Sequence, residues 1–156
     1  MTPYIVAAVV ALVVAVIGGL ATDVGPWYRA LKKPPWNPPD WLFGPAWTVI
    51  YGLIVWAAGL TWIAAPPDIR WWVVALPFAL NAVLNALWSV LFFSVKSPEK
   101  ASLEVIALWV STASLVVIAS LYSTKAAWLL GVYLAWVTFA SALNFSIVRR
   151  NKPMVL

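Results

Sequence analysis

Residues 27–51 read WYRALKKPPWNPPDWLFGPAWTVIY, and long apolar runs lie on both sides of this stretch. It contains four of the 12 tryptophans, together with two tyrosines and five prolines. The Pro34–Pro35 and Pro38–Pro39 pairs prevent a continuous helix, because proline lacks an N–H donor and its ring clashes with the preceding turn. A loop that is stiff before binding loses less entropy when it binds a ligand. We therefore expect residues 25–42 to form the lid of a ligand pocket among helices.

A plainer interpretation of the same aromatic residues is a belt at the membrane surface, where Trp and Tyr gather in many membrane proteins. The belt accounts well for Trp41, Trp62 and the Trp71–Trp72 pair. It does not account for the paired prolines of the loop. We therefore assign Trp41 to the belt and Trp47, in the helix that follows the loop, to the wall of the pocket.

The composition of the chain indicates a membrane protein. Of its 156 residues, 64% are hydrophobic and only 10% are charged, whereas soluble domains carry about 25% charged residues. A hydrocarbon core of about 30 Å is crossed by about 20 apolar residues in a helix. The apolar runs predict an all-α integral membrane protein, a single domain (residues 1–156) that is a bundle of five transmembrane helices. Their expected positions are about 4–21, 43–65, 71–95, 98–122 and 127–148.

The residue types that are missing exclude several kinds of chemistry. The chain has no cysteine and no histidine. Disulfides, zinc sites of the Cys/His kind and haem held by an axial His or Cys are therefore excluded, and we expect no metal site. A His general base or a Cys nucleophile is excluded as well. No phosphate-binding loop of the G-x-x-x-x-G-K-[ST] type is present.

The net charge of +5 is better explained by membrane orientation than by nucleic acid, because the basic residues lie at the ends of the apolar runs. Cytoplasmic loops of membrane proteins carry an excess of Lys and Arg. We expect the N-terminus outside, and the 25–42 loop and the C-terminus in the cytoplasm. The predicted cytoplasmic side has Arg29, Lys32, Lys33, Lys96, Lys100, Arg149, Arg150 and Lys152, against Arg70 and Lys125 on the other side.

Polar residues inside the apolar runs are few. Asn81 and Asn85 share a stripe with Trp88, and Asn144 shares one with Trp136. Two interpretations stay open: the amides bond helix to helix, or they are the polar anchors of a pocket with apolar walls. No Asp, Glu, Lys or Arg lies near the centre of a predicted helix, and Glu104 is expected near the interface. Ion-coupled transport normally requires such a central charge, so it is disfavoured.

The sequence resembles the tryptophan-rich sensory protein / translocator protein family, also called peripheral-type benzodiazepine receptors (TSPO/MBR). The matching pieces are the 27–51 stretch, then LNAVLNALWSVLFF (80–93), then YLAWVTFASALNFSI (133–147) followed by Arg149 and Asn151. The resemblance implies a five-helix bundle, commonly a homodimer, that binds porphyrins, sterols in some members, and synthetic ligands. Where the family's sterol pattern has a tyrosine this chain has Phe145, so porphyrin-type ligands rank above sterols.

The resemblance also implies the residues of the pocket. They come from the loop and from the second, third and fifth predicted helices. By motif position they are Trp27, Tyr28, Trp36, Trp47, Tyr51, Asn85, Trp88, Phe92, Trp136, Phe139 and Ala140.

The leading hypothesis is a membrane receptor or carrier for protoporphyrin IX-like tetrapyrroles and other flat hydrophobic ligands. The porphyrin would be a ligand and not a cofactor, and the other partners are membrane lipids and a second copy of the chain. One alternative is an enzyme that degrades porphyrin with light and oxygen, for which Trp47, Trp136 and Tyr28 are the candidate redox residues. Another is a lipid or sterol transporter.

Overall fold

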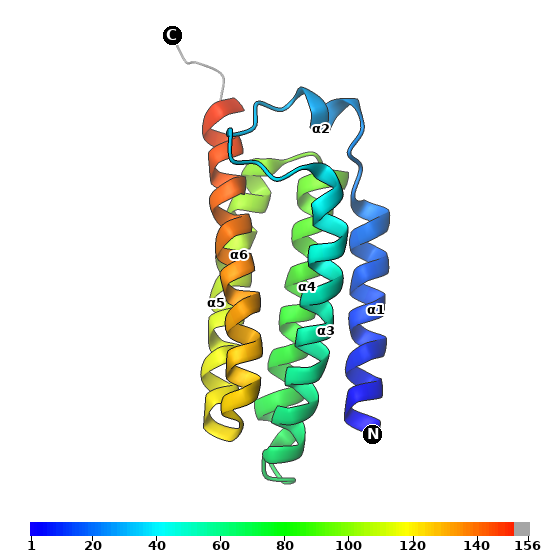
Figure 1. The fold of residues 1–156 in the computed structure, drawn as a ribbon, viewed down its shortest axis with the longest axis vertical. Coiled ribbons are helices and arrows are strands. Elements are labelled where there is room, and N and C mark those ends of the chain that lie inside the picture. The colour runs from blue at the N-terminus through cyan, green and yellow to red at the C-terminus, as the bar shows by residue number, and fades with distance from the viewer. Residues whose placement is uncertain (152–156) are drawn as a thin grey trace.

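The computed structural model of the protein describes residues 1–151, so the predicted cytoplasmic Lys152 lies outside the described residues. The prediction of a five-helix membrane bundle is confirmed, because the described part of the chain contains five helices that are long and apolar enough to cross a membrane. The axes of these helices are roughly parallel to one another (Figure 1). They are α1 (Thr2–Ala21), α3 (Asp40–Ala64), the unit Trp71–Ser94, α5 (Pro98–Tyr122) and α6 (Thr124–Asn151).

Helix α3 begins at Asp40, before the start that Gly44 and Pro45 led us to predict. Pro39 is the extended N-cap residue, and its carbonyl accepts the N–H of Leu42 at 2.9 Å. An acidic residue in the first turn, Asp40, interacts favourably with the helix dipole. Pro45 therefore lies inside the helix, where its missing N–H leaves only one carbonyl of the preceding turn without its partner.

Two π-helical turns flank the central part of the third membrane span. Turn η1 (Trp71–Ala75) precedes α4 (Leu76–Ser89), and turn η2 (Val90–Ser94) follows it. Pro77, near the start of α4, has no N–H to donate. The helix is wider just before it, and the N–H of Leu76 donates to the carbonyl of Trp71. Wide turns of this kind are rare and often lie at functional sites.

Helix α5 begins as its sequence predicts. The side chain of Ser97 accepts the N–H of Lys100 at 3.4 Å, and Pro98 occupies the first turn. Lys96, just before the cap, has a positive φ of 56°. This left-handed residue reverses the chain between η2 and α5.

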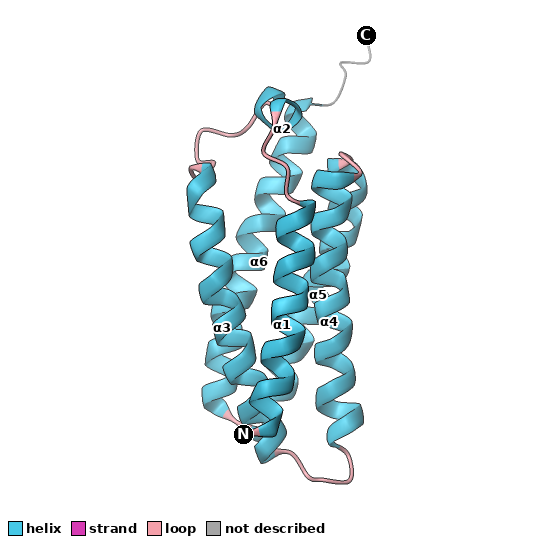
Figure 2. Cartoon of the chain, turned by 90° about the vertical axis from the view of Figure 1, so that its right-hand side faces the viewer, coloured by secondary structure: helices cyan, strands magenta, loops and turns pink. Residues whose placement is uncertain are grey.

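The helices divide into a tight pair and a looser group. Helices α5 and α6 pack along their whole length, and the fully buried Leu115, Leu130 and Tyr133 lie in this core. Helix α1 packs against α3 and α4 and lies in front of them in Figure 2. A Cβ at Gly59 would collide with the ring of Tyr4, so this glycine allows α1 to approach α3 closely.

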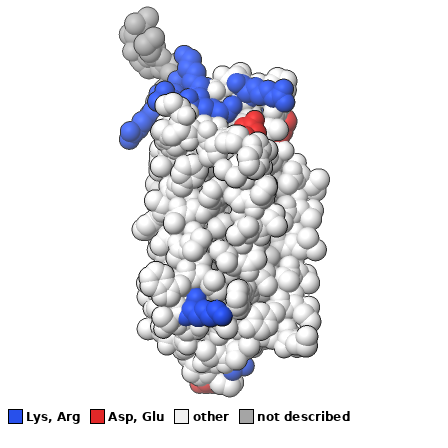
Figure 3. Space-filling model, viewed as in Figure 1, with Lys and Arg blue, Asp and Glu red and all other residues white. Residues whose placement is uncertain are grey.

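The end of the bundle that carries the loop is the basic end. Helix α2 (Pro26–Ala30) and the rest of the 25–42 loop lie across the ends of the long helices there (Figure 1). Figure 3 shows the blue side chains of Lys and Arg gathered at this end, with the wall of the bundle almost free of charge. We call this the lid side, and the half of the bundle near the N-terminus the N-terminal side.

Candidate functional site

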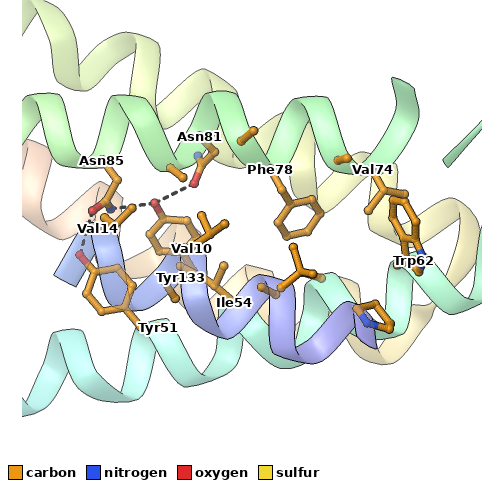
Figure 4. Close-up of a pocket in the computed structure, with 18 of the residues that line it drawn as sticks. Val10, Val14, Tyr51, Ile54, Trp62, Val74, Phe78, Asn81, Asn85 and Tyr133 are labelled. Carbon is orange, nitrogen blue, oxygen red and sulfur yellow. Dashed lines mark hydrogen bonds between the residues drawn. The ribbon is translucent and has the colours of Figure 1, made fainter. Parts of the chain in front are cut away.

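A hydrogen-bonded layer of four polar side chains crosses the middle of the bundle (Figure 4). The hydroxyl of Tyr51 donates to Asn85 at 3.0 Å, and the amide of Asn85 donates to the hydroxyl of Tyr133 at 3.0 Å. The Tyr133 hydroxyl in turn donates to Asn81 at 3.1 Å. The two asparagines lie one turn apart on α4, so both amides reach the same tyrosine of α6. We call these four residues the polar layer.

The polar layer is also fixed to α5. The amide of Asn81 donates to Ser111 at 3.2 Å and to Thr112 at 3.0 Å. In the same way, the amide of Asn144 in α6 donates to the carbonyl of Pro98 at 2.9 Å and to Ser102. The interpretation of the intramembrane amides as helix-to-helix bonds is therefore confirmed for Asn81 and Asn144. The bond from Asn81 shows that Ser111 faces the inside of the bundle.

A cavity of about 400 Å³ lies on the N-terminal side of the polar layer, between α1, α3 and the η1–α4 segment. Its inner end is formed by the polar layer, and Phe78 and Ile54 line its middle (Figure 4). Trp62 and Trp71 line its other end. Ligand pockets are commonly about 300–1,000 Å³ in volume, so the cavity is large enough for a small molecule.

The lid side of the polar layer is instead filled by aromatic rings. The ring of Trp47 stacks on Tyr51 at 5.5 Å between centroids and meets the edge of Trp136 at 6.0 Å. Trp136 lies 5.6 Å from Phe139, which in turn is 5.8 Å from Trp36 of the loop. We call this the first ring cluster. It joins α3, α6 and the lid.

A second ring cluster surrounds the buried Phe92 of η2. Trp88 lies 5.6 Å from Phe92, and Trp27 and Tyr28 of the lid lie 6.1 and 6.5 Å from it. The ammonium of Lys33 lies 4.0 Å from the centre of the Tyr28 ring. Burial, with a smaller contribution from the carboxylate of Asp40, raises the pKa of Tyr28 to about 12. Its phenol is therefore protonated, and so uncharged, at neutral pH.

Two hydrogen bonds hold the lid to the end of α6. The backbone N–H of Lys32 donates to the side chain of Asn151 at 3.0 Å, and the amide of Asn151 donates to the carbonyl of Lys32 at 3.0 Å. One side chain thereby satisfies both backbone groups of a loop residue. We call this pair the lid latch.

The eleven residues predicted to bind ligand lie in three places. Tyr51 and Asn85 belong to the polar layer and also line the cavity. Ala140 is half-buried on α6. The remaining eight belong to the ring clusters: Trp36, Trp47, Trp136 and Phe139 to the first, and Trp27, Tyr28, Trp88 and Phe92 to the second. Of the candidate redox residues, Trp47 and Trp136 are in contact, and Tyr28 lies in the other cluster. Their roles in binding or chemistry stay predictions.

Five buried side-chain groups have no hydrogen-bond partner within the described part of the chain. They are the indole nitrogens of Trp88 and Trp136, the carboxyl of Glu104, and the amide oxygens of Asn37 and Asn144. Glu104 was expected near the interface, but it is only 9% exposed, because its side chain points into the bundle from α5. A buried polar group without a partner costs about 1–3 kcal/mol, so these atoms are available to a ligand.

Tyr133 and the contribution of α1 to the cavity were not predicted from the sequence. Tyr133 lies three residues before Trp136 and hence on the same helical face, a signal that could have identified it. Helix α1 gave no such signal, because its side chains that line the cavity, such as Val10 and Val14, resemble those that face lipid.

Comparisons with known proteins agree on one family. A sequence model of the TspO/MBR family matches residues 6–150. The tryptophan-rich protein TspO of Archaeoglobus fulgidus is 39% identical over 134 residues, which are 84% of this chain and 84% of the relative. Protein CrtK of Rhodobacter capsulatus is 37% identical over 147 residues, 88% of each chain. The human translocator protein is 32% identical over 126 residues, 80% of this chain and 75% of the relative.

Proposed function

The chain belongs to the TspO/MBR family of membrane proteins, and from this premise we propose that it is a receptor or carrier for porphyrins of the protoporphyrin IX kind. Other flat hydrophobic molecules would use the same site. We place that site on the lid side, between the two ring clusters and beneath the lid. The ligand would be held by stacking and by hydrogen bonds, with no metal ligand from the protein.

One observation supports this proposal above the others: the indole N–H groups of Trp88 and Trp136 are buried without an acceptor within the described residues. The two rings belong to different clusters on different helices, α4 and α6. A porphyrin offers acceptors in its carboxylate side chains and flat faces for stacking on aromatic rings. A ligand between the clusters would therefore satisfy donors that the protein alone leaves unpaired.

Entry of the ligand would require the lid to move. The rings of Trp27, Tyr28 and Trp36 contact the clusters from above, and the lid latch fixes Lys32 to Asn151. We propose that the latch opens, the lid rings separate from Phe92 and Phe139, and the ligand takes their place. The prolines would keep the lid stiff during this movement.

The orientation and the assembly belong to the same proposal. The basic residues at the lid side (Figure 3) favour a cytoplasmic lid and an external N-terminus. A homodimer is proposed from the family alone, because helix faces exposed to lipid and to a second copy are equally apolar. Cysteine labelling from either side of the membrane tests the orientation, and cross-linking in membranes tests the dimer.

Titration with protoporphyrin IX tests the binding proposal. Trp88→Phe and Trp136→Phe keep a ring and remove the unpaired donor. Each is expected to weaken porphyrin binding about tenfold, the value of one hydrogen bond of about 1.4 kcal/mol. Trp128→Phe is the matched control, because Trp128 is 76% exposed on the outside of the bundle. Equal affinity in all four proteins would contradict the proposed site.

A further inference from the structure

The cavity on the N-terminal side has a different chemistry from the lid side. We infer that it is a second ligand site, which binds one hydrocarbon chain of a lipid or fatty acid with an anionic head group. The inference does not depend on the proposed porphyrin site, which it meets only at Tyr51 and Asn85. The chain would lie along α4, with its tail at the polar layer and its head at the mouth near Trp62.

The polar side chains at the inner end of the cavity do not need a hydrogen bond from a ligand. Every side chain of the polar layer has a hydrogen-bond partner within the bundle. This contrasts with the unpaired indole groups of the lid side. A ligand group that ends at Tyr51 and Asn85 therefore gains no hydrogen bond that the protein lacks, and the apolar end of a chain fits there without cost.

The walls and length of the cavity suit a chain. Between the polar layer and the mouth the lining is apolar, with Val10 and Ala11 of α1 facing Ile54 and Phe78. From Val74 to Asn85 the cavity follows α4 for about 16 Å, at about 1.5 Å per residue. A chain that enters from the bilayer leaves surroundings as apolar as these walls, so the cavity favours it through the fit of shape and length.

The cavity opens toward the surrounding lipid. Among its lining residues, Val6 is 58% exposed and Trp71 is 67% exposed on the outside of the bundle. Both lie in segments that are long and apolar enough to cross a membrane. The π-helical turn η1 carries Trp71, Val74 and Ala75 to the wall of the cavity. The molecules that meet this opening are lipid chains, which is why we commit to them as the occupant.

A cation at the mouth supports an anionic head group. The guanidinium of Arg70 lies 5.7 Å from the centre of the Trp62 ring, and its Nε donates to the carbonyl of Ala65 at 2.9 Å. These contacts fix the side chain beside a residue that lines the cavity. They leave the two terminal nitrogens of the guanidinium, which suit a carboxylate or a phosphate. Both head groups share this chemistry, and the experiment separates them.

Photo-cross-linking in lipid nanodiscs tests the inference. Two probes carry a diazirine near the middle of the chain: a free fatty acid and a phosphatidylglycerol. We expect adducts, mapped by mass spectrometry, at Phe78, Val10 and Ile54. Adducts from the fatty acid alone identify a free acid as the occupant, and adducts from the phospholipid alone identify a membrane lipid. Arg70→Gln is expected to reduce the yield of adducts several-fold for whichever probe labels the cavity.

Filling the cavity provides the decisive variants. Ala11→Leu with Ala82→Leu fills it from α1 and α4, and Ala58→Leu fills it separately from α3. Both filled variants are expected to reduce the yield of cavity adducts about tenfold. Their melting temperature is measured as a check on folding, and we expect it to be at or above that of the unchanged protein. Ala8→Leu is the matched control, since Ala8 is exposed on α1 and does not line the cavity.

The two proposed sites can fail separately. Porphyrin titration of the filled variants is expected to give unchanged affinity, because none of these alanines belongs to the ring clusters. Adducts that persist in both filled variants, or that fall equally on Val9 and Val13 of the exposed face of α1, would overturn the second site. Loss of porphyrin binding in Trp88→Phe with unchanged adducts would leave it standing.

Discussion

The lid side and the N-terminal side of the bundle are built from the same five helices but differ in how the space is filled and how the polar atoms are paired. On the lid side, rings from three long helices and the loop fill the space and leave buried polar atoms unpaired. On the N-terminal side, the side chains of the polar layer are paired and the helices enclose a cavity. The polar layer separates the two.

This difference indicates how each side of the bundle would select its ligand. An apolar cavity selects a ligand by shape alone, because lipid tails are as apolar as its walls. An unpaired donor selects by chemistry, because only a ligand with an acceptor at the right place removes its cost. We therefore expect the lid side to discriminate among ligands and the cavity to accept chains of many kinds.

The largest expected effect comes from breaking the first ring cluster. Trp136→Ala removes the ring that contacts Trp47, Phe43 and Phe139. Deleting such a ring is expected to lower the free energy of unfolding by about 3 kcal/mol, as measured by denaturation in detergent. Trp128→Ala, on the exposed face of the same helix, should change it by less than about 0.5 kcal/mol. Equal losses would mean that the cluster is not a packed unit.

The next effect concerns the layer that separates the two sides. Asn81→Leu leaves the hydroxyls of Tyr133 and Ser111 without the amide they contact. We expect a loss of about 2 kcal/mol in the free energy of unfolding, the cost of buried polar groups left unpaired. Ser114→Ala on α5 is the control, because that hydroxyl donates to the carbonyl of Val110 in its own helix. If Asn81→Leu lowers the free energy of unfolding by less than Ser114→Ala does, water has replaced the amide.

The extent to which the sequence predicts each side follows from the range of the interactions involved. Helix existence depends on local apolar length, and the start of α5 on the local Ser97-Pro98 cap, so both could be predicted. The start of α3 could not, because proline favours the first turn of a helix, and nothing local shows that the helix begins several residues before Pro45.

The candidate site is predictable only where it is made of distinctive residues. The aromatic lid and its partners stand out in composition and in their resemblance to a family. The hydrogen bond between Tyr133 and Asn81 joins residues 52 positions apart. It could not be predicted, because the sequence of neither helix determines how the two apolar helices are aligned along their axes. A cavity between helices is harder still to predict, since it depends on how the helices are spaced and not on any one residue type.

The pKa of Tyr28 offers a way to loosen the lid without a substitution. Its pKa is about 12 in the folded protein, and about 10 in an unfolded chain. The folded state therefore binds this proton more tightly, and its stabilisation is present below pH 10 and lost as the pH rises to about 12. We expect a loss approaching about 2 kcal/mol in lid stability over that interval.

Hydrogen exchange of residues 27–39, compared at pH 9 and pH 11.5, measures this loss. Exchange itself accelerates with pH, so the comparison is made against Tyr28→Phe, which cannot ionise but fills nearly the same space. The unchanged protein should lose protection relative to Tyr28→Phe only at the higher pH. An identical pH dependence in both would show that the phenol does not hold the lid.

The smallest expected effect tests the lid latch. Asn151→Ala removes both hydrogen bonds to Lys32 from an exposed site, where water replaces them, so we expect only about 1 kcal/mol of lid stability to be lost. Protection of the 27–39 amides should fall several-fold, and porphyrin should associate faster if opening of the lid limits entry. Chain cross-linking in the cavity should not change, because the latch lies on the other side of the polar layer. Arg150→Ala is the neighbouring control, because within residues 1–151 the Arg150 guanidinium hydrogen-bonds to Ser146 of its own helix. A change in cavity adducts on opening the lid would mean that the polar layer transmits movement between the two sides and does not merely separate them.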